Sequence, residues 1–434
     1  MNSGLMLAII LISVLVSIAI GFKFKISTGV VAMVFAYIIG CFFMDLKVSE
    51  IVAMWPTKIA FMLMSITLFY GYAVENGTLK MMADKMLYVV KDVAWAVPIA
   101  IFVICTILAG IGAGAPAVTA FMAPIGIAIA MQTGMNPLLV LIAISSGSLA
   151  GSNFTLSQGG VIVRGLLEAT EYADQSMAMT TSVFAHSFIE NTIVFLIAYF
   201  VFKGYKIKKI EMNKPEPATS VQKKNLYIII GVMLLILVPV VVNLFAKNPV
   251  TVKMAKYCDI QMLAIVGALL CAALKLGDEK KIIKNHIPWN TIVMVGGISM
   301  LMGVATVAGV VEFLSNWVSS SIPTFIVPGV LVFIAGGMSF FSGAVTVVVP
   351  MLVPIVPSLS ATTGLNPVLL ISCILIGSCC TGISPFSTGG SLLLSGIKDD
   401  QLRDKIFYKQ FVTTIIVWIL VFILATVGVF SIFK

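Results

Sequence analysis

Four short stretches rich in Gly, Ser and Thr interrupt long apolar runs of the sequence. They are GIGAGAPAVT (110–119), GSNFTLSQGG (151–160), FFSGAVT (340–346) and TGISPFSTGG (381–390). Glycine lets backbone N–H groups approach a ligand closely, and helices that begin after Pro116, Gly160 and Gly390 would direct their positive ends at that ligand. Hydroxyls and carbonyls beside such a site can coordinate Na⁺. These residue types predict non-covalent binding of a small anion together with a cation.

The candidate ligands lie in these four stretches or one helical turn beyond the second. The candidates for the anion are Gly114, Ala115, Pro116, Ser152, Asn153, Thr155, Gly159, Gly160, Arg164, Gly343, Thr346, Ser384, Pro385, Ser387, Thr388 and Gly389. The candidates for Na⁺ are Gly112, Ser152, Asn153, Ser342 and Ser384. We expect Gly159 and Gly389 to adopt the positive φ that glycine permits. Gly/Ser motifs also occur where helices only pack closely, but four interruptions in matching places favour a binding site.

Three groups of ionisable residues lie within or at the edge of apolar runs, where such residues are candidates for function. Arg164 would bind a substrate carboxylate or pair with Glu168, four residues further on. His186 and Glu190, one turn apart, would form a proton relay or a mutually satisfied structural pair, and we favour the structural pair. Residues 75–77 (Glu-Asn-Gly) end an apolar run, where a helix cap is the favoured interpretation.

The composition excludes a water-soluble protein. Of the 434 residues, 60% are hydrophobic and 10% are charged, far below the charged fraction of a soluble domain. A soluble enzyme, a nucleic-acid-binding protein and a secreted disulfide scaffold are therefore excluded, and the net charge of +9 fits an excess of basic residues in cytoplasmic loops. The seven cysteines form no CxxC pair, and the scarcity of His argues against haem or zinc. We expect no cofactor except a coupling ion, Na⁺ or H⁺.

An internal repeat divides the chain. TGMNP (133–137) recurs as TGLNP (363–367), and the same offset aligns several further Gly, Ser and Pro residues. These pairs are Pro124 with Pro354, Gly147 with Gly377, Ser157 with Ser387, and Gly159 with Gly389. The sequence predicts two structural halves, residues 1–210 and 225–434, joined by a Lys-rich linker at 203–225.

Both halves show the same order of apolar runs. The first has spans near 4–22, 27–44 and 57–75, an amphipathic stretch at 78–92, a re-entrant hairpin about 93–131, a broken helix at 136–168 and a span at 180–202. The second has spans at 226–246, 258–276 and 289–309, a hairpin about 324–359, a broken helix at 366–396 and a span at 409–433. We read the first run as a spanning helix and not as a signal peptide. The fold class is an all-α polytopic membrane protein with two repeats of five transmembrane helices and one hairpin each.

The basic residues predict the orientation of these spans. Five spans per half is an odd number, so the two repeats must be inverted relative to each other. With the linker in the cytoplasm and both termini outside, 20 of the 27 Lys and Arg residues lie on the cytoplasmic side. Paired interruptions at membrane depth in inverted repeats are typical of secondary transporters that bind substrate near the midplane. We therefore expect a multi-pass protein of the cell membrane.

Two segments carry a family resemblance. GAGAPAVTAFMAPIGIAIA (112–130) and SPFSTGGSLLLSG (384–396) resemble the ion transporter superfamily, and within it the divalent anion:sodium symporters and the MatC-type dicarboxylate (malonate) carriers. The resemblance implies a homodimer in which a mobile, elevator-like transport domain moves against a scaffold and carries dicarboxylates with cations. The sodium symporters usually have Ser-Asn-Thr at both hairpin tips, whereas the tips here are Gly-Ala-Gly-Ala-Pro and Ser-Gly-Ala-Val-Thr.

The sequence thus predicts a secondary active transporter that imports a small organic dianion, a C4-dicarboxylate or malonate, by cation symport. Its partners are the lipid bilayer, the anion and a second copy of the chain. One alternative is an Na⁺/H⁺ or other ion exchanger, which intramembrane Asp residues would favour. A second alternative is the membrane subunit of an uptake system that depends on a periplasmic binding protein.

Overall fold

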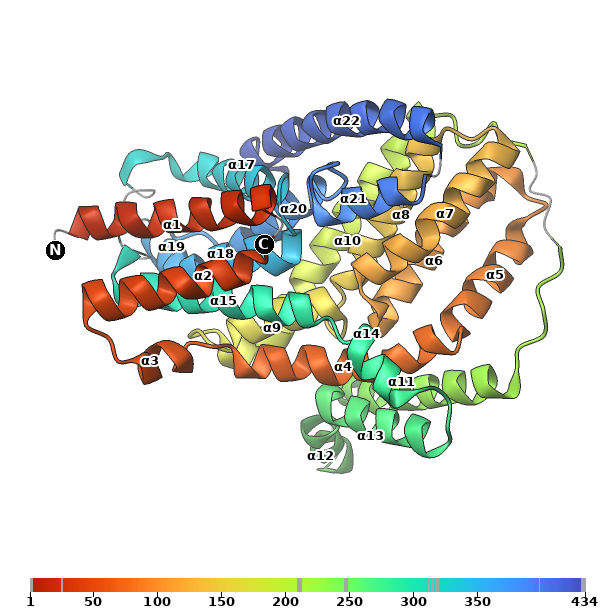
Figure 1. The fold of residues 1–434 in the computed structure, drawn as a ribbon, viewed down its shortest axis with the longest axis horizontal. Coiled ribbons are helices and arrows are strands. Elements are labelled where there is room, and N and C mark those ends of the chain that lie inside the picture. The colour runs from red at the N-terminus through yellow and green to blue at the C-terminus, as the bar shows by residue number, and fades with distance from the viewer. Residues whose placement is uncertain are drawn as a thin grey trace.

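The computed structural model confirms an all-helical fold. It describes residues 3–430 except 25, 209–212, 246–248, 311–312, 314–315, 317–319 and 398, so the extreme termini and part of the predicted linker lie outside the described residues. Within this part of the chain, seven helices are long and apolar enough to cross a membrane, and further apolar helices are shorter. The protein is therefore a multi-pass membrane protein (Figure 1).

The first half of the chain begins with helices that include the predicted early spans. These are α1 (Ser3–Phe24), α2 (Thr28–Tyr37) with its π-helical continuation η1 (Ile38–Phe43), α3 (Val48–Ala53), α4 (Thr57–Glu75) and α5 (Thr78–Val90). The hairpin and the broken helix follow as η2 (Ala94–Ala96), α6 (Val97–Leu108), η3 (Ala109–Ala113), α7 (Ala115–Thr133), α8 (Pro137–Ser152) and α9 (Gln158–Leu167). The half ends with η4 (Ala173–Gln175) and α10 (Ser176–Val201).

The described part of the second half also contains a hairpin, a broken helix and a last span in that order. It begins with α11 (Ser220–Phe245), α12 (Pro249–Tyr257), α13 (Ile260–Ala273), α14 (Glu279–Asn285) and α15 (Trp289–Val307). The hairpin consists of η5 (Thr324–Ile326), α17 (Val327–Ser339), η6 (Ala344–Val348), α18 (Val349–Leu352), η7 (Val353–Ile355) and α19 (Val356–Thr363). The broken helix and the last span are α20 (Pro367–Cys380), α21 (Thr388–Ser395) and α22 (Asp400–Thr426).

The repeated TGxNP motif builds the same turn twice. Gly134 and Gly364 adopt left-handed conformations with φ of 70° and 69° and end the helices before them. Asn136 then caps α8 by accepting a hydrogen bond from the Leu138 amide, and Asn366 caps α20 in the same way. Local geometry therefore repeats between the halves, while the inverted orientation of the two halves stays a prediction.

Some helices extend beyond the predicted spans. The last helix begins at Asp400 and not near 409, because the Asp399 side chain accepts hydrogen bonds from the amides of Gln401 and Leu402 and so caps it. Likewise, α11 begins at Ser220, inside the predicted linker. Both arms of the first hairpin, with 20 and 19 residues, are long enough to cross a bilayer, so length does not test whether this hairpin is re-entrant.

Two interior helices, α8 and α20, form the centre of the molecule. α8 packs against α6, α7 and α10, while α20 packs against α17, α10 and α22. Glycines make the contacts close: a Cβ on Gly147 would overlap the carbonyl oxygen of Phe102, and one on Gly377 would lie 2.7 Å from the Cα of Val332. A separate apolar cluster joins α2 and α15, which lie side by side with α1 in Figure 1. Because α8 ends at Ser152 and α20 ends at Cys380, both helix breaks begin at the ends of interior helices.

Candidate functional site

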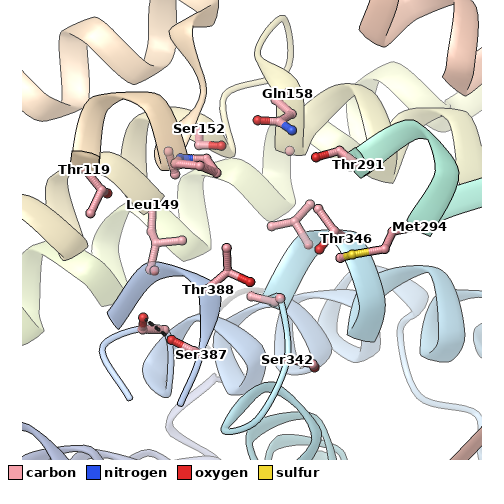
Figure 2. A pocket seen from close by; sticks show the side chains of 18 of the residues that line it. Thr119, Leu149, Ser152, Gln158, Thr291, Met294, Ser342, Thr346, Ser387 and Thr388 are labelled. Atoms are coloured by element: carbon pink, nitrogen blue, oxygen red, sulfur yellow. Dashed lines mark hydrogen bonds between the residues drawn. The ribbon is translucent and has the colours of Figure 1, made fainter. Parts of the chain in front are cut away.

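All four interrupted stretches meet at one cavity of about 190 Å³ (Figure 2). Ala115 and Pro116 come from the first hairpin tip, and Ser342, Gly343 and Thr346 come from the second. The two helix breaks contribute Ser152, Gln158, Gly159, Gly382, Ser387, Thr388 and Gly389. Segments that are more than 200 residues apart in sequence thus line a single space. Of the predicted ligands, Ala115, Pro116, Ser152, Gly159, Ser342, Gly343, Thr346, Ser387, Thr388 and Gly389 line the cavity.

Other lining residues were not predicted. Asn290, Thr291 and Met294 come from the beginning of α15, and Thr119, Ser145, Leu149, Gln158, Ala344, Val345 and Gly382 complete the wall. The polar pair Asn290-Thr291 directly follows Pro288-Trp289 at the start of an apolar span, and this was the signal available in the sequence. Figure 2 shows Thr291 and Met294 on the opposite side of the space from Thr119 and Leu149.

Four helices begin at the cavity wall. They are α7 at Ala115, α9 at Gln158, α15 at Trp289 and α21 at Thr388. Helix N-termini carry a partial positive charge and unpaired N–H groups, and both favour an anion. Among the described residues that line the cavity, none is charged. The wall thus offers backbone amides, hydroxyls and side-chain amides, which are groups that can hold an anion without a charged side chain.

The first helix break is fixed by hydrogen bonds from its own polar side chains. Ser157 Oγ donates to the Ala109 carbonyl at 2.6 Å and so ties the break to the first hairpin. Asn153 Nδ2 donates to Ser187 Oγ at 2.8 Å and to Cys379 Sγ at 3.4 Å. The Oδ1 atom of Asn153 is buried without a hydrogen-bond partner. Asn153 lies behind the cavity wall and leaves one oxygen free to act as a ligand.

The second break is held in a similar way. Ser384 Oγ donates to the Phe340 carbonyl at 2.8 Å, which ties this break to the second hairpin. Ser387 caps α21, since its Oγ accepts a hydrogen bond from the Gly390 amide at 3.1 Å. Gln410 Nε2, on α22, donates to the carbonyls of Ile383 and Gly390. Among the predicted ligands, Ser384 and the adjacent Pro385 do not line the cavity.

The expected positive φ at Gly159 and Gly389 is wrong, because neither is among the glycines with positive φ in the described chain. These glycines are required for close packing of the breaks. A Cβ on Gly159 would lie 2.5 Å from Asn153 Oδ1 and 2.8 Å from the Ser152 carbonyl oxygen, and one on Gly389 would lie 2.8 Å from the Gly382 carbonyl oxygen. Gly160 and Gly390 likewise face the carbonyls of their own loops and not the cavity.

Positive φ occurs instead at the first hairpin tip. Gly112 has φ of 104° and Gly114 has φ of 76°, and L-residues rarely adopt either value. A Cβ on Gly114 would overlap Gln158 Oε1, and one on Gly112 would overlap the ring of Tyr70. The tip thus requires glycine both for its turn and for its contact with the first helix break. Gly112 lines a neighbouring cavity and not the main one.

Arg164 does not line the cavity. Its Nε lies 2.9 Å from Glu168 Oε1, and one of its terminal nitrogens lies 3.6 Å from Asp259 Oδ2. Lys58 also pairs with Glu168, at 3.1 Å. The structure therefore favours the ion-pair role over the substrate role for Arg164, and we remove it from the candidate ligands. Thr155, whose Oγ1 lies 3.4 Å from Thr181 Oγ1, also lies outside the cavity wall.

His186 and Glu190 are both buried on α10, and each has a hydrogen-bond partner. His186 Nδ1 lies 2.7 Å from Ser372 Oγ on α20. Glu190 accepts a hydrogen bond at 2.7 Å from Asn191, which also donates to the Ser187 carbonyl. These contacts join α10 to α20 and to the Asn153 network. Neither residue lines the cavity, which favours a structural role.

Comparison with known proteins identifies the family. Residues 4–152 match the family described as dicarboxylate carrier protein MatC N-terminus, and residues 177–431, more than half of the chain, match the sodium:sulfate symporter transmembrane region. None of the curated proteins matches. Among solved structures, the fold is similar to that of the Alcanivorax borkumensis YdaH transporter, described as having an unusual topology. The two chains are 13% identical, with 88% of this chain and 86% of that chain covered and a TM-score of 0.57.

These matches confirm the predicted resemblance to divalent anion:sodium symporters and MatC-type carriers. They also agree with a cavity at which four helices begin and whose described lining residues include no charged side chain. The chain therefore belongs to the sodium:sulfate symporter family and is a multi-pass, Na⁺-coupled anion transporter rather than an enzyme.

Proposed function

We propose that this transporter carries a small organic dianion, a C4-dicarboxylate or malonate, into the cell by symport with Na⁺. The observation that supports the proposal most strongly is the convergence of four helix N-termini on one uncharged cavity. Two carboxylates at opposite ends of a short chain can each face amides from a different hairpin and helix break. The match of residues 4–152 to a dicarboxylate carrier family favours an organic dianion over sulfate.

The Na⁺ ligands that we propose lie beside the first helix break. Asn153 Oδ1 is a buried acceptor without a partner, and a buried unpaired amide oxygen is costly unless something binds it. A Cβ on Gly159 would lie 2.5 Å from this atom and 2.8 Å from the Ser152 carbonyl oxygen, so both oxygens lie next to Gly159. An amide oxygen, a backbone carbonyl and the Ser152 hydroxyl form a suitable donor set for a hard monovalent cation. Ser342 is a second Na⁺ candidate that lines the main cavity.

An elevator-like movement is part of the proposal. The hairpins and broken helices, with α10 and α22, would form the mobile transport domain, and α1–α5 with α11–α15 would form the scaffold. The cavity supports this division, because Asn290, Thr291 and Met294 of α15 face the four interrupted stretches across it. We further propose that the two halves are inverted repeats and that the transporter is a homodimer in the cell membrane.

An ion exchanger of the same superfamily remains the alternative within transport. Such a protein would need an acidic side chain at its binding site. The described residues that line the cavity include none, which favours the symport of an anion. The alternative of a subunit that depends on a binding protein predicts no transport by the purified chain alone.

Binding to the purified protein tests the substrate class. We expect malonate or succinate to raise the melting temperature in Na⁺ buffer and to have little effect in K⁺ buffer, because ligands stabilise the state that binds them. Thr388→Val, which removes a hydroxyl at the cavity wall, should weaken this effect, whereas Thr362→Val on an exposed face of α19 should not. Stabilisation by sulfate but by neither dicarboxylate would overturn the proposed substrate class.

A further inference from the structure

A second cavity of about 200 Å³ adjoins the main cavity. Pro116, Gln158 and Thr291 line both cavities and therefore form the neck between them. The second cavity extends from this neck to the end of α4 and to the segment before α15, where His286 lies in its wall. An anion that leaves the main cavity through the neck would enter this space.

A carboxylate held by two basic side chains lies next to the wall of the second cavity, which His286 lines and which Glu75 and Lys281 adjoin through it. The Nε2 atom of His286 is 3.0 Å from Glu75 Oε2, and Lys281 Nζ bonds to the other oxygen of Glu75. The side chains of Glu75 and His286 are 17% and 22% exposed, so both are reachable but largely enclosed. Among the described residues that line this cavity, His286 is the one that can carry a positive charge.

Hydrogen bonds between α4, α11 and the loop before α14 hold the elements around this cluster in place. Asn76 Nδ2 donates to the Leu276 carbonyl at 3.1 Å, and Gln222 Nε2 donates to the Asn76 carbonyl at 3.4 Å. α4, α11 and the loop before α14 are thereby tied together, and Figure 1 shows α14 next to the end of α4 and α11. The hydrogen bond with Glu75 raises the pKa of Lys281, which stays charged near neutral pH. The hydrogen bonds fix the geometry, and the Lys281 ammonium is present there near neutral pH.

We propose that the second cavity leads to a second binding site for the transported anion. At this second site, Lys281 and His286 bind a substrate carboxylate in exchange for the carboxylate of Glu75. The inference rests on the proposed function, since it takes an organic dianion as the substrate. Exchange of one carboxylate for another leaves the basic pair neutralised at every stage. Glu75 therefore prevents the pair from trapping the anion, and it makes this end of the path selective for carboxylates.

The charge of the cavity can be measured by cysteine labelling. Ala117 is exposed in the second cavity, and Ala117→Cys in purified full-length protein would react with a negatively or a positively charged methanethiosulfonate reagent. Glu75→Gln should raise the ratio of anionic to cationic labelling rates by about fivefold, and His286→Gln or Lys281→Gln should lower it, because a unit charge nearby changes the local potential. The parent protein without the new cysteine gives the background from native cysteines.

Protection by substrate completes the test. Succinate in Na⁺ buffer should slow anionic labelling of Ala117→Cys, and His286→Gln should abolish this protection, while labelling of Gln401→Cys at the start of α22 should be unaffected by succinate. No labelling at position 117, or ratios that none of the three charge variants changes, would overturn the inference. Uptake of the dianion by the wild-type protein is measured separately. Loss of the proposed function is therefore distinguished from the absence of this second site.

Discussion

At the residue scale, the proposed site depends on the absence of a Cβ at Gly114 and on the unpaired amide oxygen of Asn153. Gly114 has the backbone of a conformation that is largely restricted to glycine, with φ of 76° and ψ of 151°, and the absence of a Cβ makes room for Gln158. Asn153 uses its amide nitrogen to join α10 and α20 and leaves its oxygen unpaired beside the first break. Gly114 shapes the first hairpin tip, and Asn153 would offer an oxygen to the cation in the proposed Na⁺ site.

Gly114→Ala should therefore disable the transporter. We expect a loss of about 1–3 kcal/mol in stability from backbone strain, together with a displaced Gln158 and at least a tenfold drop in uptake. Gly134→Ala is the matched control, because Gly134 also has positive φ but no atom lies within 4 Å of its would-be Cβ. Melting temperature and uptake should be measured for both variants. Equal uptake in the two would show that the contact with Gln158 is unimportant.

Asn153→Ala should raise the Na⁺ concentration needed for half-maximal uptake by about tenfold, equivalent to about 1.4 kcal/mol of lost binding. The reason is the loss of the unpaired Oδ1 oxygen from the proposed Na⁺ site. Thr155→Ala lies in the same break, but the Thr155 hydroxyl contacts Thr181 Oγ1 and is not among the proposed Na⁺ ligands, so this variant should leave the Na⁺ dependence unchanged. Uptake at varied Na⁺ gives the comparison. An unchanged Na⁺ dependence in Asn153→Ala would remove this atom from the cation site.

At the scale of elements, sequence reasoning located the interruptions but not everything that faces them. Gly, Pro and Ser act locally, so the hairpin tips and helix breaks could be read from composition and from the repeat. Asn290 and Thr291 were missed because a polar pair at the start of an apolar helix has no periodic signal that shows which way it faces. Arg164 was placed among the ligands because its partner Asp259 lies far away in the sequence and close in space.

The ion pairs of Arg164 connect α9 to other elements, and a charge exchange tests them. Arg164→Glu alone should lower stability by about 1 kcal/mol and reduce uptake, because the introduced carboxylate would face the carboxylates of Glu168 and Asp259. Adding Glu168→Arg should restore part of the uptake by rebuilding the pair in reverse. Uptake and melting temperature are the readouts. A double variant as inactive as the single one, with wild-type stability, would return Arg164 to the substrate site.

At the scale of the whole molecule, the distribution of basic residues predicts which segments face the cytoplasm and which face the outside. In Figure 1, α4 runs toward the same end of the molecule as residues 203–208 and 213–219, the described parts of the segment between α10 and α11. That segment is rich in Lys and is predicted to lie in the cytoplasm, so the second cavity would open there. The proposed inverted arrangement of the two halves requires the same orientation.

Labelling of single cysteines in cells tests this orientation. A cysteine in place of Lys214 should react with a membrane-impermeant reagent only after the membrane is opened, because the linker is predicted to be cytoplasmic. A cysteine in place of Asp174, in the acidic loop before α10, should react in intact cells. Reaction of both positions from the same side would contradict the inverted-repeat arrangement.

Uptake by the purified protein in liposomes tests Na⁺-coupled dicarboxylate transport most directly. Radiolabelled succinate and malonate are offered with an inward Na⁺ gradient, and matched liposomes receive K⁺ or a proton gradient instead. With Na⁺ symport, we expect at least one dicarboxylate to accumulate above its equilibrium level when the Na⁺ gradient is present alone. We expect no accumulation with K⁺. Accumulation driven only by protons, or none of either dicarboxylate in protein that remains folded, would contradict Na⁺-coupled dicarboxylate transport.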